Sequence, residues 1–178
     1  MKGGFSTILP YHLFCPNMKV DSVSDIKPEL FKQRGIRGLV FDLDNTILPW
    51  GGARIPEDIS VWFSRLKAEE FSFCLVSNSY EKRVCQFAAA LSASYVAWAC
   101  KPSIRGFQKA ADKMNLHPEQ VAVIGDQLFT DILGGNRAGL FTILVEPLST
   151  KEFPTTRISR ILEKKLLNKL KAEGMINF

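Results

Sequence analysis

The order of segments along this chain predicts a doubly wound α/β fold with a mostly parallel, five-stranded sheet flanked by helices. Short apolar runs, typical of strands buried on both faces, alternate with stretches whose apolar residues recur at helical spacing. This alternation is the signature of a parallel sheet covered by helices. The predicted strands are residues 37–43, 72–77, 94–99, 121–126 and 141–146.

The first predicted strand ends in an acidic segment. Gly38-Leu39-Val40-Phe41 is followed directly by Asp42-Leu43-Asp44-Asn45-Thr46. In sheets of this class, ligands bind outside the carboxyl ends of the strands. Two carboxylates at such an end, Asp42 and Asp44, suit a divalent cation together with a nucleophile and a proton donor. The alternative is an ordinary turn, because Asp and Asn are favoured in turns.

The next three predicted strands also end in polar residues. The residues concerned are Ser77 with Asn78, Lys101, and Asp126 with Asp131. The Ser77 hydroxyl could hold a phosphoryl oxygen, and Lys101 would be a point charge facing the same cleft. Pro102 suits the first turn of the helix expected after Lys101. All of these side chains are therefore expected at one edge of the sheet, around one site.

Together these residues resemble the four signatures of the haloacid dehalogenase (HAD) superfamily of aspartate-nucleophile phosphatases. Asp42-Leu43-Asp44-Asn45-Thr46 resembles the first motif and Ser77 the second. Lys101 resembles the third, and Gly125-Asp126 with Asp131 the fourth. The resemblance covers residues 36–147 and implies the Rossmann-like fold of that superfamily.

The resemblance implies a role for each residue. Asp42 would be the nucleophile that forms an aspartyl-phosphate, and Asp44 the general acid and base. The residues implied to bind the substrate phosphate are Thr46, Ser77, Asn78 and Lys101. The implied Mg²⁺ ligands are Asp42, Asp44 through its backbone carbonyl, Asp126 and, directly or by orienting the site, Asp131. For Thr46, a helix or turn cap is the alternative.

The spacing of the motifs resembles that of superfamily members without a cap domain. Only a loop and one helix, with Ile59, Trp62, Phe63 and Leu66 on one face, are expected between the first two motifs. Capless members tend to act on macromolecular or surface-presented phosphates. The segment from Pro28 to Asp42 also resembles the YqeG-type branch, which includes phosphatidylglycerophosphate phosphatases. This resemblance implies removal of the terminal phosphate of an anionic phospholipid.

The basic residues of the chain are concentrated at its ends. Residues 151–178 contain seven Lys or Arg and three Asp or Glu residues, whereas the whole chain has a net charge of +5. Residues 155–172 are expected to form an amphipathic helix, whose predicted apolar face is Ile158, Ile161, Leu162, Leu166 and Leu170. We favour packing of this helix on the core, with peripheral contact to an anionic membrane as the alternative. No nucleic-acid partner is expected, because no recognisable binding module accompanies the charge.

The chain divides into three predicted parts. These are an N-terminal strap or arm (1–34), a catalytic core (35–150) and the basic C-terminal helix (151–178). The composition, 46% hydrophobic over 178 residues, suits one substantial core, and no apolar run is long enough to span a membrane. Cys74 falls in a predicted strand and Cys100 at the end of another, so we expect buried, reduced thiols. We therefore expect a cytoplasmic enzyme, with a peripheral position at a membrane surface as the alternative.

Two other functions remain open from the sequence. One is a phosphatase of the same type acting on a phosphoprotein, a nucleic-acid end or a small metabolite. The other is a non-catalytic scaffold that keeps the fold. The converging carboxylates argue against the scaffold, because they repel one another unless a metal is bound.

Overall fold

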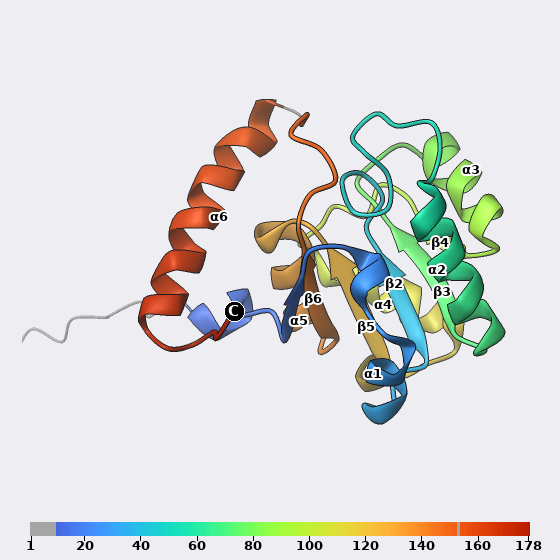
Figure 1. Ribbon diagram of the computed structural model, residues 1–178, viewed down its shortest axis with the longest axis horizontal. Helices are drawn as coiled ribbons and strands as arrows, with labels where there is room; N and C mark the ends of the chain where they lie inside the picture. Colours follow the sequence, from blue (N-terminus) through green and yellow to red (C-terminus); the bar gives the residue numbers. More distant parts are fainter. Residues whose placement is uncertain (1–9, 153) are drawn as a thin grey trace, which may run out of the picture.

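The computed structural model describes residues 10–152 and 154–178, and it has the predicted α/β architecture (Figure 1). One parallel sheet has the strand order β1-β6-β5-β2-β3-β4. The strands are β1 Met18–Val20, β2 Gly38–Phe41, β3 Ser72–Val76, β4 Ser94–Val96, β5 Val121–Gly125 and β6 Phe141–Val145. The α-helices are α1 Pro28–Gln33, α2 Glu57–Ala68, α3 Glu81–Leu91, α4 Ile104–Met114, α5 Leu133–Arg137 and α6 Pro154–Ala172.

The prediction of five strands was wrong by one edge strand. Strand β1 comes from the segment predicted to be a strap, and it pairs with β6. Its three residues are half-buried and include Lys19, so they form no apolar run that sequence reasoning could detect. The part of the predicted arm that comprises residues 1–9 lies outside the described residues.

The core has two halves, one on each face of the sheet. Successive residues of a strand point to opposite faces, so Phe41 packs in one half and Val40 in the other. The Phe41 ring lies 5.8 Å from that of Trp62 and 4.7 Å from that of Phe63, both on α2. Val40 belongs to the same buried cluster as Phe107 of α4. Full burial of such a side chain contributes roughly 1.5–3 kcal/mol, which fixes β2 at the centre of the sheet.

The third predicted strand ends earlier than expected. Strand β4 stops at Val96 instead of residue 99 because Trp98 and Cys100 have φ angles of 50° and 53°, outside the range of a strand. Cys100 is therefore exposed, which corrects the expectation that it is buried. Helix α4 begins at Ile104 after the cap residue Ser103, so Pro102 lies in a preceding turn and not in the first helical turn.

Among the described residues, no cap domain covers the carboxyl edge of the sheet. In residues 42–101, all of which the structure describes, α2 is the helix between β2 and β3, and α3 is the helix between β3 and β4. These two helices are labelled beside the sheet in Figure 1. Within these residues, no inserted domain therefore covers the edge at which β2, β3 and β5 end.

Candidate active site

The carboxyl ends of the central strands bring the predicted residues together. A cavity of about 380 Å³ lies at this edge, and five of the eight predicted site residues line it. These five are Asp42, Asp44, Ser77, Asn78 and Lys101. The parallel register of β2 with β3 and β5 explains the convergence, because all three strands end at the same level. Asp131 forms an ion pair with Lys101 of this cavity, and Asp126 places a carboxylate oxygen within 4.8 Å of one from Asp42.

Lys101 lies between two acids. Its Nζ atom is 2.6 Å from Oδ1 of Asp42 and 2.6 Å from Oδ1 of Asp131. Burial would lower the pKa of Lys101, but the charges of Asp131 and Asp42 outweigh it, so the pKa is raised. Lys101 therefore remains a cation and neutralises part of the charge of the acids around it.

Three buried acids form a candidate metal site. Asp42, Asp126 and Asp131 each place one carboxylate oxygen so that the three atoms lie within 4.8 Å of one another. Burial raises the pKa of Asp42 to about 6, although Lys101 opposes this effect. Burial also raises the pKa of Asp126 to about 8, against the opposing charge of Arg160. An all-oxygen set whose charges are poorly solvated fits a hard divalent cation such as Mg²⁺.

These raised pKa values predict how the stability of the metal-free protein depends on pH. Ordinary carboxyl groups have pKa values near 4, so the folded chain keeps a proton on Asp42 up to about pH 6 and on Asp126 up to about pH 8, where the unfolded chain has lost both. The free energy of unfolding should therefore fall as the pH rises through this range. Thermal unfolding in a chelator at pH 6 and pH 8.5 measures the effect, and Mg²⁺ should reduce the difference.

The control for this pH dependence is Asp126→Asn, which removes the group with the higher pKa of the two. This variant should show a flatter dependence of the unfolding temperature on pH. A wild-type unfolding temperature that stayed constant or rose between pH 6 and 8.5 in the chelator would contradict the prediction.

Asp44 lies apart from the group of three acids. Its Oδ1 accepts a hydrogen bond of 2.7 Å from Nη2 of Arg83, and its Oδ2 accepts one of 2.9 Å from Oγ of Ser79. Arg83 also donates to the main-chain oxygen of Gly52 at 3.1 Å. The carboxylate of Asp44 is thus held in the cavity by neighbours other than those of Asp42, so the two acids can take different roles.

The predicted phosphate ligands Ser77, Asn78 and Thr46 differ in what they contact. Ser77 lies buried beside the cavity, and its Oγ accepts a hydrogen bond of 3.1 Å from the Ser79 N–H, which leaves the hydroxyl proton to donate. The Asn78 side chain instead exchanges two hydrogen bonds with the main chain of Lys101 and so fixes that loop. Thr46 does not line the cavity, where it was expected to bind phosphate. It donates to Oδ1 of Asp126 at 3.1 Å and so orients one acid of the candidate metal site.

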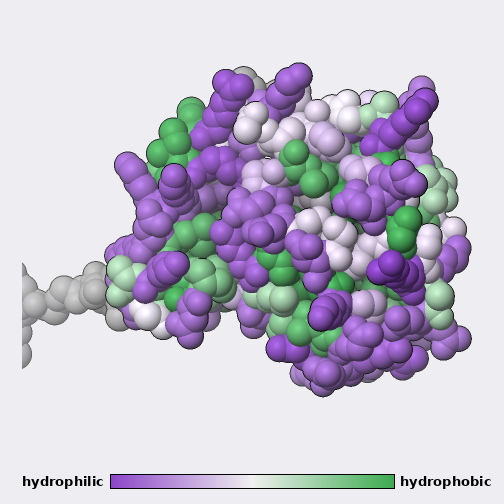
Figure 2. Space-filling model, viewed as in Figure 1, coloured by the Kyte–Doolittle hydropathy of each residue, from purple (hydrophilic) through white to green (hydrophobic). Residues whose placement is uncertain are grey.

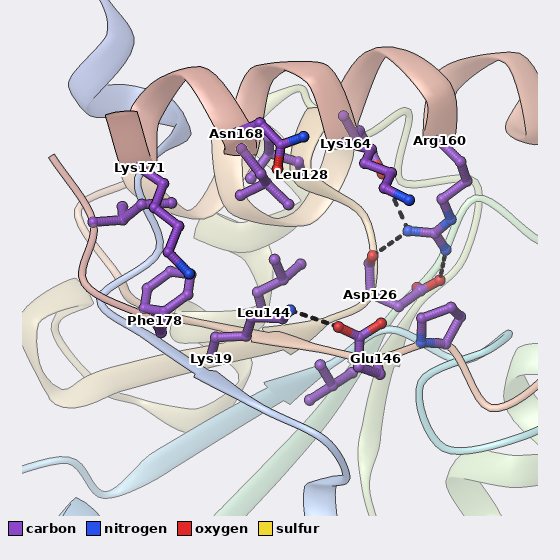
Figure 3. A pocket seen from close by; sticks show the side chains of 15 residues that line it. Lys19, Asp126, Leu128, Leu144, Glu146, Arg160, Lys164, Asn168, Lys171 and Phe178 are labelled. Carbon is purple, nitrogen blue, oxygen red and sulfur yellow. Dashed lines mark hydrogen bonds and ion pairs between the residues drawn. The ribbon is translucent and has the colours of Figure 1, made fainter. Parts of the chain in front are cut away.

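Two arginines at this site were not predicted. Arg83 contacts Asp44, and Arg160 of α6 contacts both the carboxylate and the main-chain oxygen of Asp126 (Figure 3). A single arginine within a helix belongs to no sequence motif. Arg160 was expected only to lie on the basic side of the amphipathic C-terminal helix. These contacts join residues 39 and 34 positions apart, so only the fold reveals them.

Comparisons with known proteins indicate the family to which this chain belongs. The HAD-hydrolase-like family model matches residues 98–152. The chain is 38% identical over 165 residues to the probable phosphatase YqeG of Bacillus subtilis, which covers 93% of this chain and 96% of that protein. It is 30% identical over 177 residues to the chloroplastic/mitochondrial phosphatidylglycerophosphate phosphatase 1 of Arabidopsis thaliana, which covers 90% of this chain and 49% of that protein.

A solved structure shares the fold. The cobalt-bound deoxy-D-mannose-octulosonate 8-phosphate phosphatase of Haemophilus influenzae matches with a TM-score of 0.52, over 80% of this chain and 92% of that one. Its sequence identity is 12%, so this likeness concerns the fold alone. The relationship to YqeG extends over nearly the whole length of both chains. This chain therefore belongs to the YqeG family of HAD-type phosphatases.

Proposed function

We propose that this phosphatase hydrolyses a phosphomonoester of an anionic phospholipid, phosphatidylglycerophosphate, with Mg²⁺ and through an aspartyl-phosphate on Asp42. The observation that carries the reaction is the placement of two differently held carboxylates in one cavity. Asp42 is paired with Lys101, and Asp44 is held by Arg83 and Ser79. Asp126 and Asp131 complete the acid group that would hold the cation. When bound, Mg²⁺ would neutralise charge on the phosphoryl oxygens.

The reaction proceeds in two displacements. In the first, a carboxylate oxygen of Asp42 forms a bond to phosphorus while the bond from phosphorus to the leaving oxygen breaks, and Asp44 gives a proton to that oxygen. In the second, Asp44 takes a proton from a water molecule whose oxygen attacks phosphorus, and the bond to Asp42 breaks. Lys101 and the Ser77 hydroxyl stabilise the charge on the transferring group. Asp42 returns to its original state, and inorganic phosphate leaves.

The choice of a lipid substrate is supported by the outer surface of α6. Part of the predicted apolar face of this helix packs on the core, and the rest is exposed to solvent. Leu170 is buried and Leu166 is half-buried, and both lie on the side that packs on the core. Ile158, Ile161 and Leu162 are exposed by 65%, 59% and 52%. Figure 2 shows hydrophobic side chains at the outer edge of this helix, among hydrophilic ones.

This exposed stripe has the character of a surface that binds anionic lipid. Lys165 and Lys169 follow Ile158, Ile161 and Leu162 at helical spacing on the same side. Apolar residues flanked by lysines suit the interface of a membrane that carries negative charge. None of the helices in the described parts of the chain has the length and apolar character needed to span a bilayer. The proposed contact is therefore peripheral, and the open catalytic edge accepts a headgroup presented by the membrane.

The substrate proposal predicts phosphate release from phosphatidylglycerophosphate in vesicles, and a triple variant tests the role of α6. Full burial of an apolar side chain contributes roughly 1.5–3 kcal/mol, and 1.4 kcal/mol corresponds to tenfold in binding. Ile158→Ser, Ile161→Ser and Leu162→Ser together should therefore lower vesicle binding and lipid turnover by at least about tenfold. Flotation of vesicles and phosphate release measure the two effects.

Two comparisons make this test specific. Turnover of a soluble phosphomonoester should stay unchanged in the triple variant, because the exposed stripe is outside the catalytic cavity. Val61→Ser removes an exposed apolar residue of α2, 47% exposed, and should change neither activity. Turnover of soluble phosphomonoesters together with inertness toward phosphatidylglycerophosphate would show that the substrate is a soluble phosphate.

A further inference from the structure

The C-terminal helix reaches the candidate metal site through one side chain. Arg160, on the first half of α6, donates from Nη2 to Oδ2 of Asp126 and from Nη1 to the main-chain oxygen of the same residue. Figure 3 shows the guanidinium group directed at Asp126. A fork that holds the carboxylate and the main chain of one residue together fixes the rotamer of that residue.

Arg160 is itself held in place by two acids. Its Nε donates to Oε1 of Glu152 at 2.7 Å, and its Nη1 donates to Oε2 of Glu163 at 3.1 Å. Glu163 is buried, and its other oxygen accepts a hydrogen bond of 3.1 Å from the Phe129 N–H. The guanidinium group therefore has a fixed position relative to both α6 and the turn that follows β5.

Arg160 approaches Asp126 from outside the catalytic cavity. Arg160 and Asp126 both line a second cavity of about 490 Å³ beneath α6, whereas Arg160 is not among the residues that line the catalytic cavity. On the other carboxylate oxygen, Oδ1, Asp126 accepts a hydrogen bond from Thr46. Each carboxylate oxygen can accept more than one interaction, so this arrangement orients Asp126 and leaves capacity to bind a cation.

We propose that Arg160 is a positioning residue for the metal ligand Asp126, so that α6 completes the metal site from outside the catalytic core. The inference rests on the proposed metal-dependent function. Partners that orient a metal-binding carboxylate are worth about 10–100-fold in metal affinity or activity. Arg160 acts through Asp126 and does not touch the substrate cavity. The geometry thus ties the helix proposed to contact lipid to the affinity of the enzyme for its cation.

The test is direct measurement of cation binding to the full chain. Calorimetry with Mg²⁺, and electron paramagnetic resonance with Mn²⁺, should show about 10–100-fold weaker binding to Arg160→Ala. Arg160→Lys keeps the charge but lacks the fork, so it should restore little of the affinity. In turnover of a soluble phosphomonoester, the Mg²⁺ concentration for half-maximal activity should rise by the same factor, while kcat at saturating Mg²⁺ recovers most of the wild-type value.

Controls separate this role from a general effect on folding. Arg157→Ala removes an exposed arginine from the preceding turn of α6 and should leave cation binding unchanged. If Arg160→Ala does not fold, Glu163→Gln, which loosens one support of Arg160, should weaken cation binding in the same direction. Far-ultraviolet circular dichroism of the metal-free proteins checks that each variant compared is folded.

Two results would overturn the inference. Tighter cation binding by Arg160→Ala would mean that Arg160 competes with the metal for Asp126, and unchanged binding would mean that it has no part in the site. Both differ from a failure of the proposed function, in which the wild-type protein itself would bind no divalent cation.

Discussion

Asp42→Asn should abolish phosphate release, lowering kcat by roughly 10⁴-fold or more, the scale expected when a nucleophile is removed. An amide oxygen cannot displace the leaving group to form an aspartyl-phosphate. The fold should persist, because Asn has the shape of Asp and its oxygen can still accept the hydrogen bond from Lys101. The substitution also removes a charge that burial disfavours, as the raised pKa of Asp42 indicates.

Phosphate release from a soluble phosphomonoester at saturating Mg²⁺ measures the effect of Asp42→Asn. Trapping of radiolabelled phosphate on the protein should succeed for the wild type and fail for the variant. Asp21→Asn removes an exposed acid near the N-terminus and serves as the control with full activity. If Asp42→Asn retained activity within tenfold of wild type, Asp42 would not be the nucleophile.

Lys101→Met should have the second large effect, on stability as well as activity. Lys101 is buried, with its Nζ 2.6 Å from both Asp42 and Asp131. Methionine fills a similar volume but leaves the two acids without this countercharge, and breaking a buried ion pair costs about 3–5 kcal/mol. For a chain of this size, the metal-free variant should unfold roughly 6–20 °C below wild type. Activity should fall by about 10²–10³-fold, because a preorganised cation is lost from the site.

Thermal unfolding with and without Mg²⁺ distinguishes this electrostatic explanation from a packing defect. A divalent cation supplies positive charge to the same acids, so Mg²⁺ should raise the unfolding temperature more in Lys101→Met than in wild type. Lys109→Met, on the exposed side of α4, should change neither stability nor activity appreciably. Equal effects of Mg²⁺ on both proteins would reject the explanation.

The central strands and the residues at their ends were predictable because they satisfy local rules. Every residue of β2 and β5 is buried, so each strand reads as an uninterrupted apolar run, and Asp42 and Asp126 follow immediately. Strand β1 was missed because three half-buried residues at the sheet edge need β6 as a partner before they form a strand. The sequence also did not reveal the positive φ angles that end β4 early.

The side-chain contacts that hold the acids of the site could not be predicted from the sequence. Arg83 and Arg160 meet their acids only after helices have packed on the sheet. The periodicity of α6 predicted its amphipathic character, but one apolar stripe could not show that Leu170 is buried while Ile158 is exposed. Helical periodicity shows which residues share one side of a helix. Which of those residues are buried and which are exposed depends on where the helix leaves the surface of the core.

Asn45 forms hydrogen bonds with two loops that are distant in the sequence. Its Oδ1 accepts hydrogen bonds from the Trp50 N–H at 3.1 Å and from Oγ of Ser149 at 3.0 Å. Its Nδ2 donates to the main-chain oxygen of Lys151, at 3.2 Å, just before α6. The loop that carries the proposed nucleophile and the segment that leads into α6 are thus both held by Asn45. The start of α6 and the loop after β2 are therefore connected by side-chain hydrogen bonds that do not pass through the sheet.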